Sequence, residues 1–194
     1  AGIHPEQAGD APEDWLTELK ELAAHPKCRA VGEIGLDYYW AENPPKERQQ
    51  ELFRQQVLLA KELGLPVIIH DREAHADTLE VLRELRPMGV LHCFSGSAEM
   101  AREAAVLGMY MGFTGAVTFK NARKAPQAAA AVPDDRLLIE TDCPYMAPEP
   151  YRGKRCDSSM LPRVAERLAE IRGCTAEEIV EMTCRNAKRL FGIA

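Results

Sequence analysis

The sequence predicts an α/β protein of the TIM-type (β/α)8 barrel class, with six parallel strands visible in its 194 residues. Short aliphatic runs alternate with longer segments that carry a helical apolar stripe. This alternation is typical of a parallel sheet that helices cover on both faces. A complete barrel of this class has eight strands and typically about 250 residues. Six strands therefore indicate a barrel that lacks its first two βα units.

The predicted elements follow one another along the whole chain. Residues 1–4 are expected to end a strand, and Trp15 begins the first helical apolar face. Pro44 and Gly64 are placed to begin and end the second helix. The predicted strands are residues 1–4, 30–36, 66–70, 89–94, 109–114 and 136–141, and the helices that follow the later ones include 122–132, 159–172 and 175–184.

The chain shows no internal linker, low-complexity segment or long-period repeat, so we expect one domain over residues 1–194. It begins with Ala-Gly-Ile, which reads as the tail of a strand and predicts a domain that is incomplete at its N-terminus. The rival architecture is an open doubly wound sheet. No GxGxxG or P-loop motif supports a nucleotide-binding version of that fold.

The composition restricts the class of protein. A formal net charge of −6 argues against a broad basic surface for nucleic acid, although local basic patches remain compatible with it. No apolar run approaches the roughly 20 residues of a membrane-spanning helix, and no signal peptide is visible. The six cysteines form no CxxC pair, so we expect reduced thiols in a cytoplasmic protein without a membrane partner.

Four side chains of metal-ligand type lie in or beside predicted strands: Glu33, His70, His92 and Asp142. The carboxyl ends of parallel strands meet at one face of a barrel, where such enzymes build their active sites. Carboxylate and imidazole ligands indicate a site for Mg, Mn, Zn or Fe rather than a thiolate site. The pattern predicts a metal-dependent hydrolase that uses divalent ions.

Two of the four carry further signals. Glu33 lies inside an apolar run, where a carboxylate is costly to bury unless it is paired or bound to metal; a structural ion pair is the alternative. Asp142 ends its strand on the same face as Glu140, and we expect it both to bind metal and to act as general base. Asp37 is expected to orient ligands or a loop, and Glu140 is expected either to support a metal ligand or to form a salt bridge.

Substrate contacts are predicted from one histidine and two arginines. His4 precedes Pro5 and is expected either to contact a phosphate or donate a proton, or to serve as a structural cap. Arg72 follows His70 by two residues, and Arg152 opens an RGKR stretch in a Pro-rich loop. Arginine suits phosphate because it can donate two parallel hydrogen bonds. An anionic substrate is therefore favoured.

Seven motifs in order resemble the TatD family of metal-dependent deoxyribonucleases, in the amidohydrolase-like superfamily. They are GIHP at 2–5, GEIGLDYYW at 32–40, HDREA at 70–74, HCFSG at 92–96, ETDCPYMAP at 140–148, RGKR at 152–155 and NAKRLFG at 186–192.

The resemblance implies a (β/α)8 barrel with up to two divalent ions (Mg, Mn, Zn or similar) and hydrolysis of phosphodiester bonds in nucleic acid by a metal-bound hydroxide. It implies that Glu33 bridges the two metals and that His70 and His92 hold one of them. Asp142 would bind the other and act as base, and His4 matches a family histidine near the active site.

The sequence departs from the family pattern in two places. The family carries a His-x-His pair on its first strand, and no such pair exists here. We expect that an incomplete N-terminus would account for this absence and for the missing strands together. After RGKR the family usually continues Asn-Glu-Pro, where this chain has Cys156-Asp157-Ser158. Two alternatives stay open. One is another amidohydrolase-type reaction on an ester, lactone or amide, and the other is a catalytically impaired metal-binding remnant.

Overall fold

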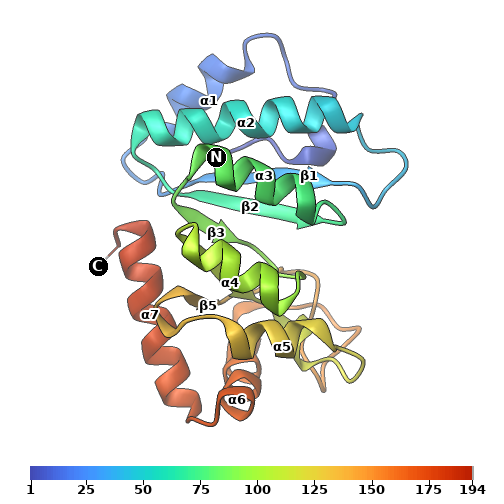
Figure 1. Ribbon diagram of the computed structural model, residues 1–194, viewed down its shortest axis with the longest axis vertical. Helices are drawn as coiled ribbons and strands as arrows, with labels where there is room; N and C mark the ends of the chain where they lie inside the picture. The colour runs from blue at the N-terminus through green and yellow to red at the C-terminus, as the bar shows by residue number, and fades with distance from the viewer. Residues whose placement is uncertain (194) are drawn as a thin grey trace. The chain divides into compact units, whose positions relative to one another are not determined.

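A computed structural model of the protein describes residues 1–193 and has the α/β architecture that the sequence predicts (Figure 1). Strands and helices alternate along the described chain, as expected of an α/β fold. The strands are β1 (Val31–Asp37), β2 (Val67–Arg72), β3 (Gly89–Leu91), β4 (Met109–Phe113) and β5 (Leu137–Ile139). The helices are α1 (Trp15–Ala23), α2 (Lys46–Leu63), α3 (His75–Leu85), α4 (Ala98–Val106), α5 (Lys124–Ala131), α6 (Leu161–Arg172) and α7 (Ala176–Phe191).

The chain groups into two compact units. The first comprises Ala1–Leu91 with Leu107–Met109 and Leu190–Gly192, and the second comprises His92–Val106 and Tyr110–Arg189 with Ile193. The expectation of one domain over residues 1–194 stays a prediction.

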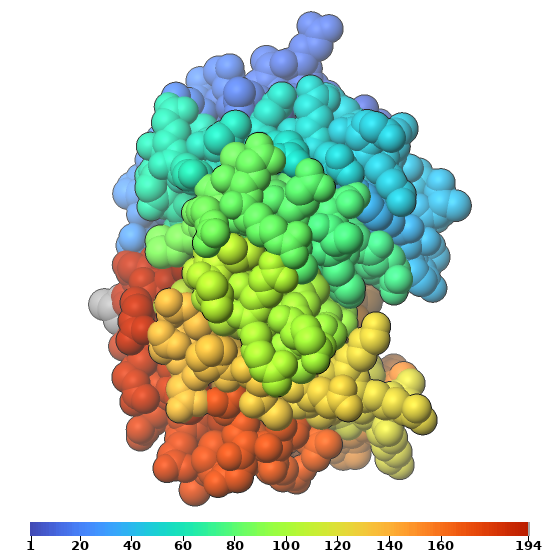
Figure 2. All heavy atoms as spheres, viewed as in Figure 1, coloured from blue at the N-terminus to red at the C-terminus, as the bar shows by residue number. Residues whose placement is uncertain are grey.

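The first unit is built on three neighbouring parallel strands, β1, β2 and β3. Helix α2 packs against β1 (Figure 1) and buries Leu52, Phe53 and Val57 on the face that meets the strand. Their spacing keeps these side chains on one stripe of the helix, so the opposite stripe can stay polar. The space-filling view shows α1, α2 and α3 following one another in close contact over this unit (Figure 2).

Strand β1 contains an irregularity at its metal-ligand candidate. Gly32 lies opposite Ile68, whereas Ile34 lies opposite the very next residue of β2, Ile69. Glu33 is thus an extra residue in β1, and such a bulge re-aims a side chain away from the ordinary alternation of a strand. This is how a carboxylate can leave an apolar run while Ile34 stays fully buried.

The prediction of six strands was wrong by one, because five occur among residues 1–193 and residues 1–4 are not a strand. The Gly32 N–H donates to the Ala1 carbonyl at 2.8 Å, and the terminal amino group of Ala1 donates to the Ala30 carbonyl at 3.3 Å. Both bonds involve Ala1 alone, so they do not extend into a ladder along residues 1–4. The buried Gln56 amide holds this segment instead, by accepting from the Ile3 N–H at 2.7 Å and donating to the Ile3 carbonyl at 3.1 Å.

The second unit pairs β4 with β5 in parallel, Met111 opposite Leu137 and Phe113 opposite Ile139. Helix α4 packs on α5, α5 packs on α6, and α6 packs on β5. Two of the predicted strands end early, β3 at Leu91 and β5 at Ile139, so His92, Glu140 and Asp142 lie in the segments that follow them.

Helix α7 is longer than the predicted 175–184. It begins behind a capping box in which Thr175 and Glu178 exchange hydrogen bonds of 2.8 and 3.2 Å. No Gly or Pro interrupts residues 176–191, so the helix continues to Phe191 and ends at Gly192, whose φ is 58°. Asn186 ties it to the start of β5 by donating to the Leu137 carbonyl at 2.9 Å.

Two composition-based expectations bear on cysteines and membranes. All six cysteines in the described chain are free thiols, in keeping with the lack of CxxC pairs. Over residues 1–193, no helix combines the length and the apolar character that crossing a bilayer requires.

The close approach of Gly35 to the backbone of His70 in the first unit leads to a prediction about stability. A Cβ atom at Gly35 would lie 2.0 Å from the His70 carbonyl oxygen, and the φ of Gly35 is 134°. Gly35→Ala should therefore lower the free energy of unfolding, measured in urea, by about 3 kcal/mol. Gly64→Ala is the control, because its φ of 66° is also positive but its Cβ would meet open space, and it should cost only about 1 kcal/mol. Equal losses in the two variants would contradict the account.

Candidate metal centre

Three of the predicted site residues converge in the first unit. His4 precedes the short helix Pro5–Gln7, Glu33 comes from the bulge in β1, and His70 comes from β2. One ligand atom from each side chain lies within 4.8 Å of the others. The two imidazole rings meet edge to face with their centroids 4.5 Å apart. The imidazole of His70 and the carboxylate of Glu33 are donors that suit a divalent transition metal such as Zn²⁺, so this pair fits such an ion.

The ring of His70 is oriented by Asp37, whose side chain is fully buried. The Nε2 atom of His70 lies 2.9 Å from Oδ2 of Asp37. Because a carboxylate only accepts hydrogen bonds, the ring proton is assigned to Nε2. This leaves the lone pair on Nδ1, which lies 3.9 Å from Oε2 of Glu33. A metal-ligating histidine commonly donates its other N–H to a carboxylate in this way.

Asp37 also fixes the loop that follows β1. Its Oδ1 accepts from the Tyr39 N–H at 3.0 Å. Gln49, 1% exposed, accepts from the Asp37 N–H at 2.8 Å and donates back to the Asp37 carbonyl at 3.0 Å. The buried carboxylate therefore connects the histidine of the cluster to the backbone of the next loop.

His4 has a second role beside the cluster. Its Nδ1 accepts from the Glu6 N–H at 3.3 Å and caps the helix Pro5–Gln7. With Nδ1 accepting, the proton of the neutral ring lies on Nε2, which makes His4 a hydrogen-bond donor rather than a ligand, although its atoms fall within ligand distance. Burial, and next the charge of His70, lower the pKa of His4.

A second cluster forms in the second unit around His92. Its Nδ1 lies 2.9 Å from Oε1 of Glu140, which also accepts from the Cys93 N–H at 2.6 Å. Its Nε2 lies 3.6 Å from Oδ1 of Asp142. A Cβ atom at Gly112 would lie 2.4 Å from the Glu140 carboxylate, so the absence of a side chain there makes room for it. The structure thus brings His4, Glu33 and His70 together in one unit, and His92 with Asp142 in the other.

The two carboxylates that orient the histidines, Asp37 and Glu140, were expected as partners of the site rather than as metal ligands, and they contact His70 and His92. The signal for Asp37 is its place at the last residue of β1, opposite Arg72 of β2. The signal for Glu140 is its position two residues before Asp142, on the same side of an extended chain.

The two predicted substrate arginines lie against aromatic rings, one in each unit. In the first, the Arg72 guanidinium carbon lies 3.9 Å from the centroid of the Tyr39 ring. In the second, Arg152 lies 4.2 Å from the centroid of Phe119 and donates to Asn121 Oδ1 at 3.3 Å. Each guanidinium group lies over the face of an aromatic ring. This arrangement leaves the N–H groups at the edge of the guanidinium plane available to an anion.

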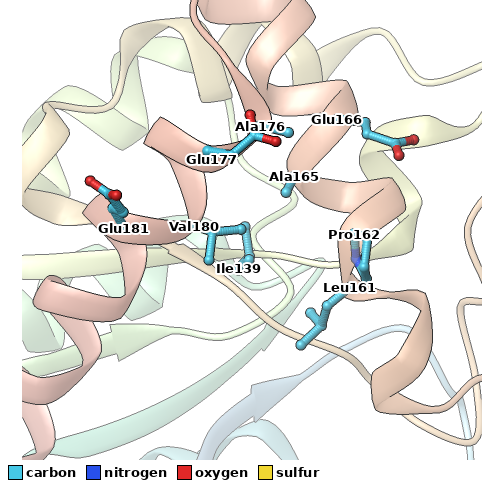
Figure 3. A pocket seen from close by; sticks show the side chains of 9 residues that line it. All are labelled: Ile139, Leu161, Pro162, Ala165, Glu166, Ala176, Glu177, Val180 and Glu181. Carbon is cyan, nitrogen blue, oxygen red and sulfur yellow. The ribbon is translucent and has the colours of Figure 1, made fainter.

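An apolar pocket of about 610 Å³ also occurs in the second unit. Figure 3 shows its lining side chains on α6, on α7 and at the end of β5, with Leu161, Val180 and Ile139 among them. None of the predicted site residues lines this pocket.

Comparison with known proteins places the chain among metal-dependent hydrolases. The sequence profile of the family described as TatD related DNase matches residues 1–192. The uncharacterized metal-dependent hydrolase YabD of Bacillus subtilis is 50% identical over 99% of this chain and 76% of YabD. The 3′-5′ ssDNA/RNA exonuclease TatD of Erwinia tasmaniensis is 34% identical over 100% of this chain and 77% of that protein.

Solved structures show the same fold. The crystal structure of YJJV, a TatD homologue from Escherichia coli K12, matches all of this chain and 76% of its own with a TM-score of 0.93 and 35% identity. A TatD family hydrolase from Entamoeba histolytica matches 98% of this chain and 73% of its own with a TM-score of 0.87 and 26% identity. The predicted TIM-type α/β class is confirmed by these likenesses.

The lowered pKa of His4 has a consequence for stability. Because the folded-state pKa lies below the ordinary value of 6.5, the unfolded chain takes up this proton first. The contribution of neutral His4 to the free energy of unfolding is therefore fully present above pH 6.5. It is lost as the pH falls through that value toward the folded-state pKa of His4. Urea unfolding of metal-free protein at several pH values should show this loss, and His4→Gln should remove it. An unchanged pH dependence in His4→Gln would refute the assignment.

Proposed function

Because the chain belongs to the TatD family of metal-dependent hydrolases, we propose that it is a deoxyribonuclease that hydrolyses phosphodiester bonds with up to two divalent ions, such as Mg, Mn or Zn. The observation that carries the proposal is the cluster of His4, Glu33 and His70, with the ring of His70 oriented by the buried Asp37. An oriented imidazole beside a carboxylate is the arrangement that metal-binding histidines use.

The proposed metal ligands are Glu33 and His70 from the first unit, and His92 and Asp142 from the second. Each histidine has one nitrogen committed to a carboxylate and the other facing a candidate ligand oxygen, at 3.9 Å for His70 and 3.6 Å for His92. A divalent ion held by such ligands supplies Lewis-acid stabilisation and lowers the pKa of bound water.

The other roles belong to the protein's own groups. Asp142 acts as general base and accepts a proton from the attacking water. His4, neutral near pH 7 because its pKa is lowered, donates a hydrogen bond from Nε2 to a phosphate oxygen. Arg72 and Arg152 bind phosphate oxygens with their guanidinium edges.

A basic surface in the second unit supports a polyanionic substrate. Two segments, 120–124 and 152–155, together carry six basic and no acidic residues in a chain whose net charge is −6. All six side chains belong to exposed residues, and the contacts of Arg152 with Asn121 and Phe119 join the two segments. Clustered cations of this kind supply the phosphate-directed part of nucleic-acid binding. The residues are Lys120, Arg123, Lys124, Arg152, Lys154 and Arg155.

The Erwinia relative is named a 3′-5′ ssDNA/RNA exonuclease, and this favours a single-stranded substrate here. An ester, lactone or amide substrate remains the alternative within the same hydrolase class. The impaired-remnant alternative is favoured by one feature of the sequence. Its five histidines include no His-x-His pair, so part of the family's ligand set has no counterpart in these residues.

The test is hydrolysis of a 3′-labelled single-stranded oligonucleotide with Mg²⁺, Mn²⁺ or Zn²⁺. We expect Glu33→Ala and His92→Ala each to lower the rate at least about 100-fold, because each removes a proposed ligand. Glu13→Ala, which removes an exposed carboxylate of the first unit, should leave the rate unchanged.

Full activity in Glu33→Ala would defeat the proposal. A protein that binds metal but cuts no oligonucleotide under any of the three ions would support the remnant or a different ester substrate, and lactones and carboxylic esters would then be tried.

A further inference from the structure

Two large aromatic side chains are exposed beside the first-unit cluster. Tyr39 is 53% exposed and Trp40 is 44% exposed, and their rings meet nearly perpendicularly with centroids 4.7 Å apart. The guanidinium carbon of Arg72 lies 3.9 Å from the Tyr39 centroid and 5.3 Å from the Trp40 centroid. We name these three side chains the aromatic shelf. The Arg72 cation stabilises the rings through their electron-rich faces, yet much of each ring stays in water.

The backbone under the aromatic shelf is tied down rather than loose. The Tyr39 N–H donates to the Asp37 carboxylate at 3.0 Å, and the Tyr38 N–H donates to the Arg72 carbonyl at 2.9 Å. Asn43 closes the turn by donating from its N–H to the Trp40 carbonyl at 3.3 Å and from its side chain to the Asp37 carbonyl at 3.1 Å. Two exposed rings are therefore held in place by a built loop, which lowers the entropy cost of stacking a ligand on them.

The aromatic shelf lies next to the proposed reaction centre. Arg72 follows His70 by two residues on β2, so both side chains project to the same face with their Cα atoms about 7 Å apart. The Asp37 carboxylate contacts both the cluster and the shelf, because it lies 2.9 Å from Nε2 of His70 and accepts from the Tyr39 N–H at 3.0 Å. A group stacked on the shelf would thus sit beside a phosphate held by His4 at the cluster.

We infer that the aromatic shelf stacks an unpaired nucleobase of a single-stranded nucleic acid whose phosphate lies at the cluster. A flat base offers an apolar face to an aromatic ring and is connected to a phosphate, so one nucleotide matches both features. Bases inside a duplex have their faces covered by neighbours, so the shelf selects for single strands. The inference rests on the proposed function, because it places the nucleotide's phosphate at the proposed centre.

A protein partner fits the aromatic shelf less well. A stable protein interface buries about 800 Å² on each partner. Two aromatic side chains supply roughly 300–500 Å² when completely buried, and these two are already about half covered. The cation beneath them further favours an anionic ligand over an apolar one.

The chain contains its own reporter for this inference. Of its two tryptophans, Trp15 is 6% exposed and Trp40 is 44% exposed, so in Trp15→Phe the tryptophan fluorescence comes from Trp40 alone. The protein is titrated in EDTA, which prevents cutting, with a single-stranded hexadeoxynucleotide, the same hexamer with abasic sites, and a duplex. We expect quenching by the single strand and little by the other two.

Affinity is measured in parallel by anisotropy of a fluorescein-labelled single strand with otherwise wild-type protein, which keeps the test independent of Trp15→Phe. Trp40→Ala and Tyr39→Ala should each weaken binding by about 5- to 150-fold, the range that base–aromatic stacking supplies. Leu22→Ala, which removes a 62% exposed apolar side chain of the same unit, should leave affinity unchanged.

Three results would each refute base stacking on the aromatic shelf. They are equal quenching by the abasic hexamer, unchanged affinity in both alanine variants, and no binding of the single strand at all. Its failure differs from failure of the proposed function. If Trp40→Ala weakens binding but the wild-type protein cuts no oligonucleotide, the base-stacking inference stands and the proposed nuclease function fails. If the wild-type protein cuts while Trp40→Ala and Tyr39→Ala bind as tightly as wild type, the nuclease function stands and the base-stacking inference fails.

Discussion

The buried carboxylate of Asp37 is the interaction on which the first unit's site depends. Removing a carboxylate from water costs several kcal/mol unless hydrogen bonds replace its hydration. Here the replacement comes from the ring of His70 and the N–H of Tyr39, while Gln49 holds the residue's own backbone. Satisfying this one group therefore sets the orientation of a candidate metal ligand and the position of the exposed aromatic loop together.

In the second unit a carboxylate also orients a histidine, but it contacts the other ring nitrogen. Glu140 contacts Nδ1 of His92, so Nε2 faces Asp142. In the first unit Asp37 contacts Nε2 of His70, so Nδ1 faces Glu33. In each unit a carboxylate, Asp37 or Glu140, fixes which nitrogen of the histidine faces the candidate ligand oxygen. The local backbone contributes in both units. The bulge at Glu33 re-aims the candidate ligand of the first unit, and Gly112 leaves room for the orienting carboxylate of Glu140 in the second.

The features that were predictable from sequence are those carried by pattern. Aliphatic runs followed by helical stripes identified β1 to β5. Ligand-type residues at run ends made His70, His92 and Asp142 candidate ligands, and their binding of metal stays a prediction. Contacts that depend on side-chain direction were less accessible. The bulge that exposes Glu33, the stacking of Arg72 on Tyr39, and the choice of nitrogen on each histidine follow from three-dimensional packing. The strand predicted at residues 1–4 is absent because only Ala1 bonds to the backbone beside β1, while both backbone groups of Ile3 bond to the side chain of Gln56.

The most direct test of the account is the tautomer of His70, read from the nitrogen-15 chemical shifts of its imidazole in metal-free protein at pH 8. Donation from Nε2 to Asp37 predicts a protonated Nε2 and an unprotonated Nδ1. A protonated Nδ1 would contradict it, because the nitrogen facing Glu33 would then carry a proton and could not accept a metal ion.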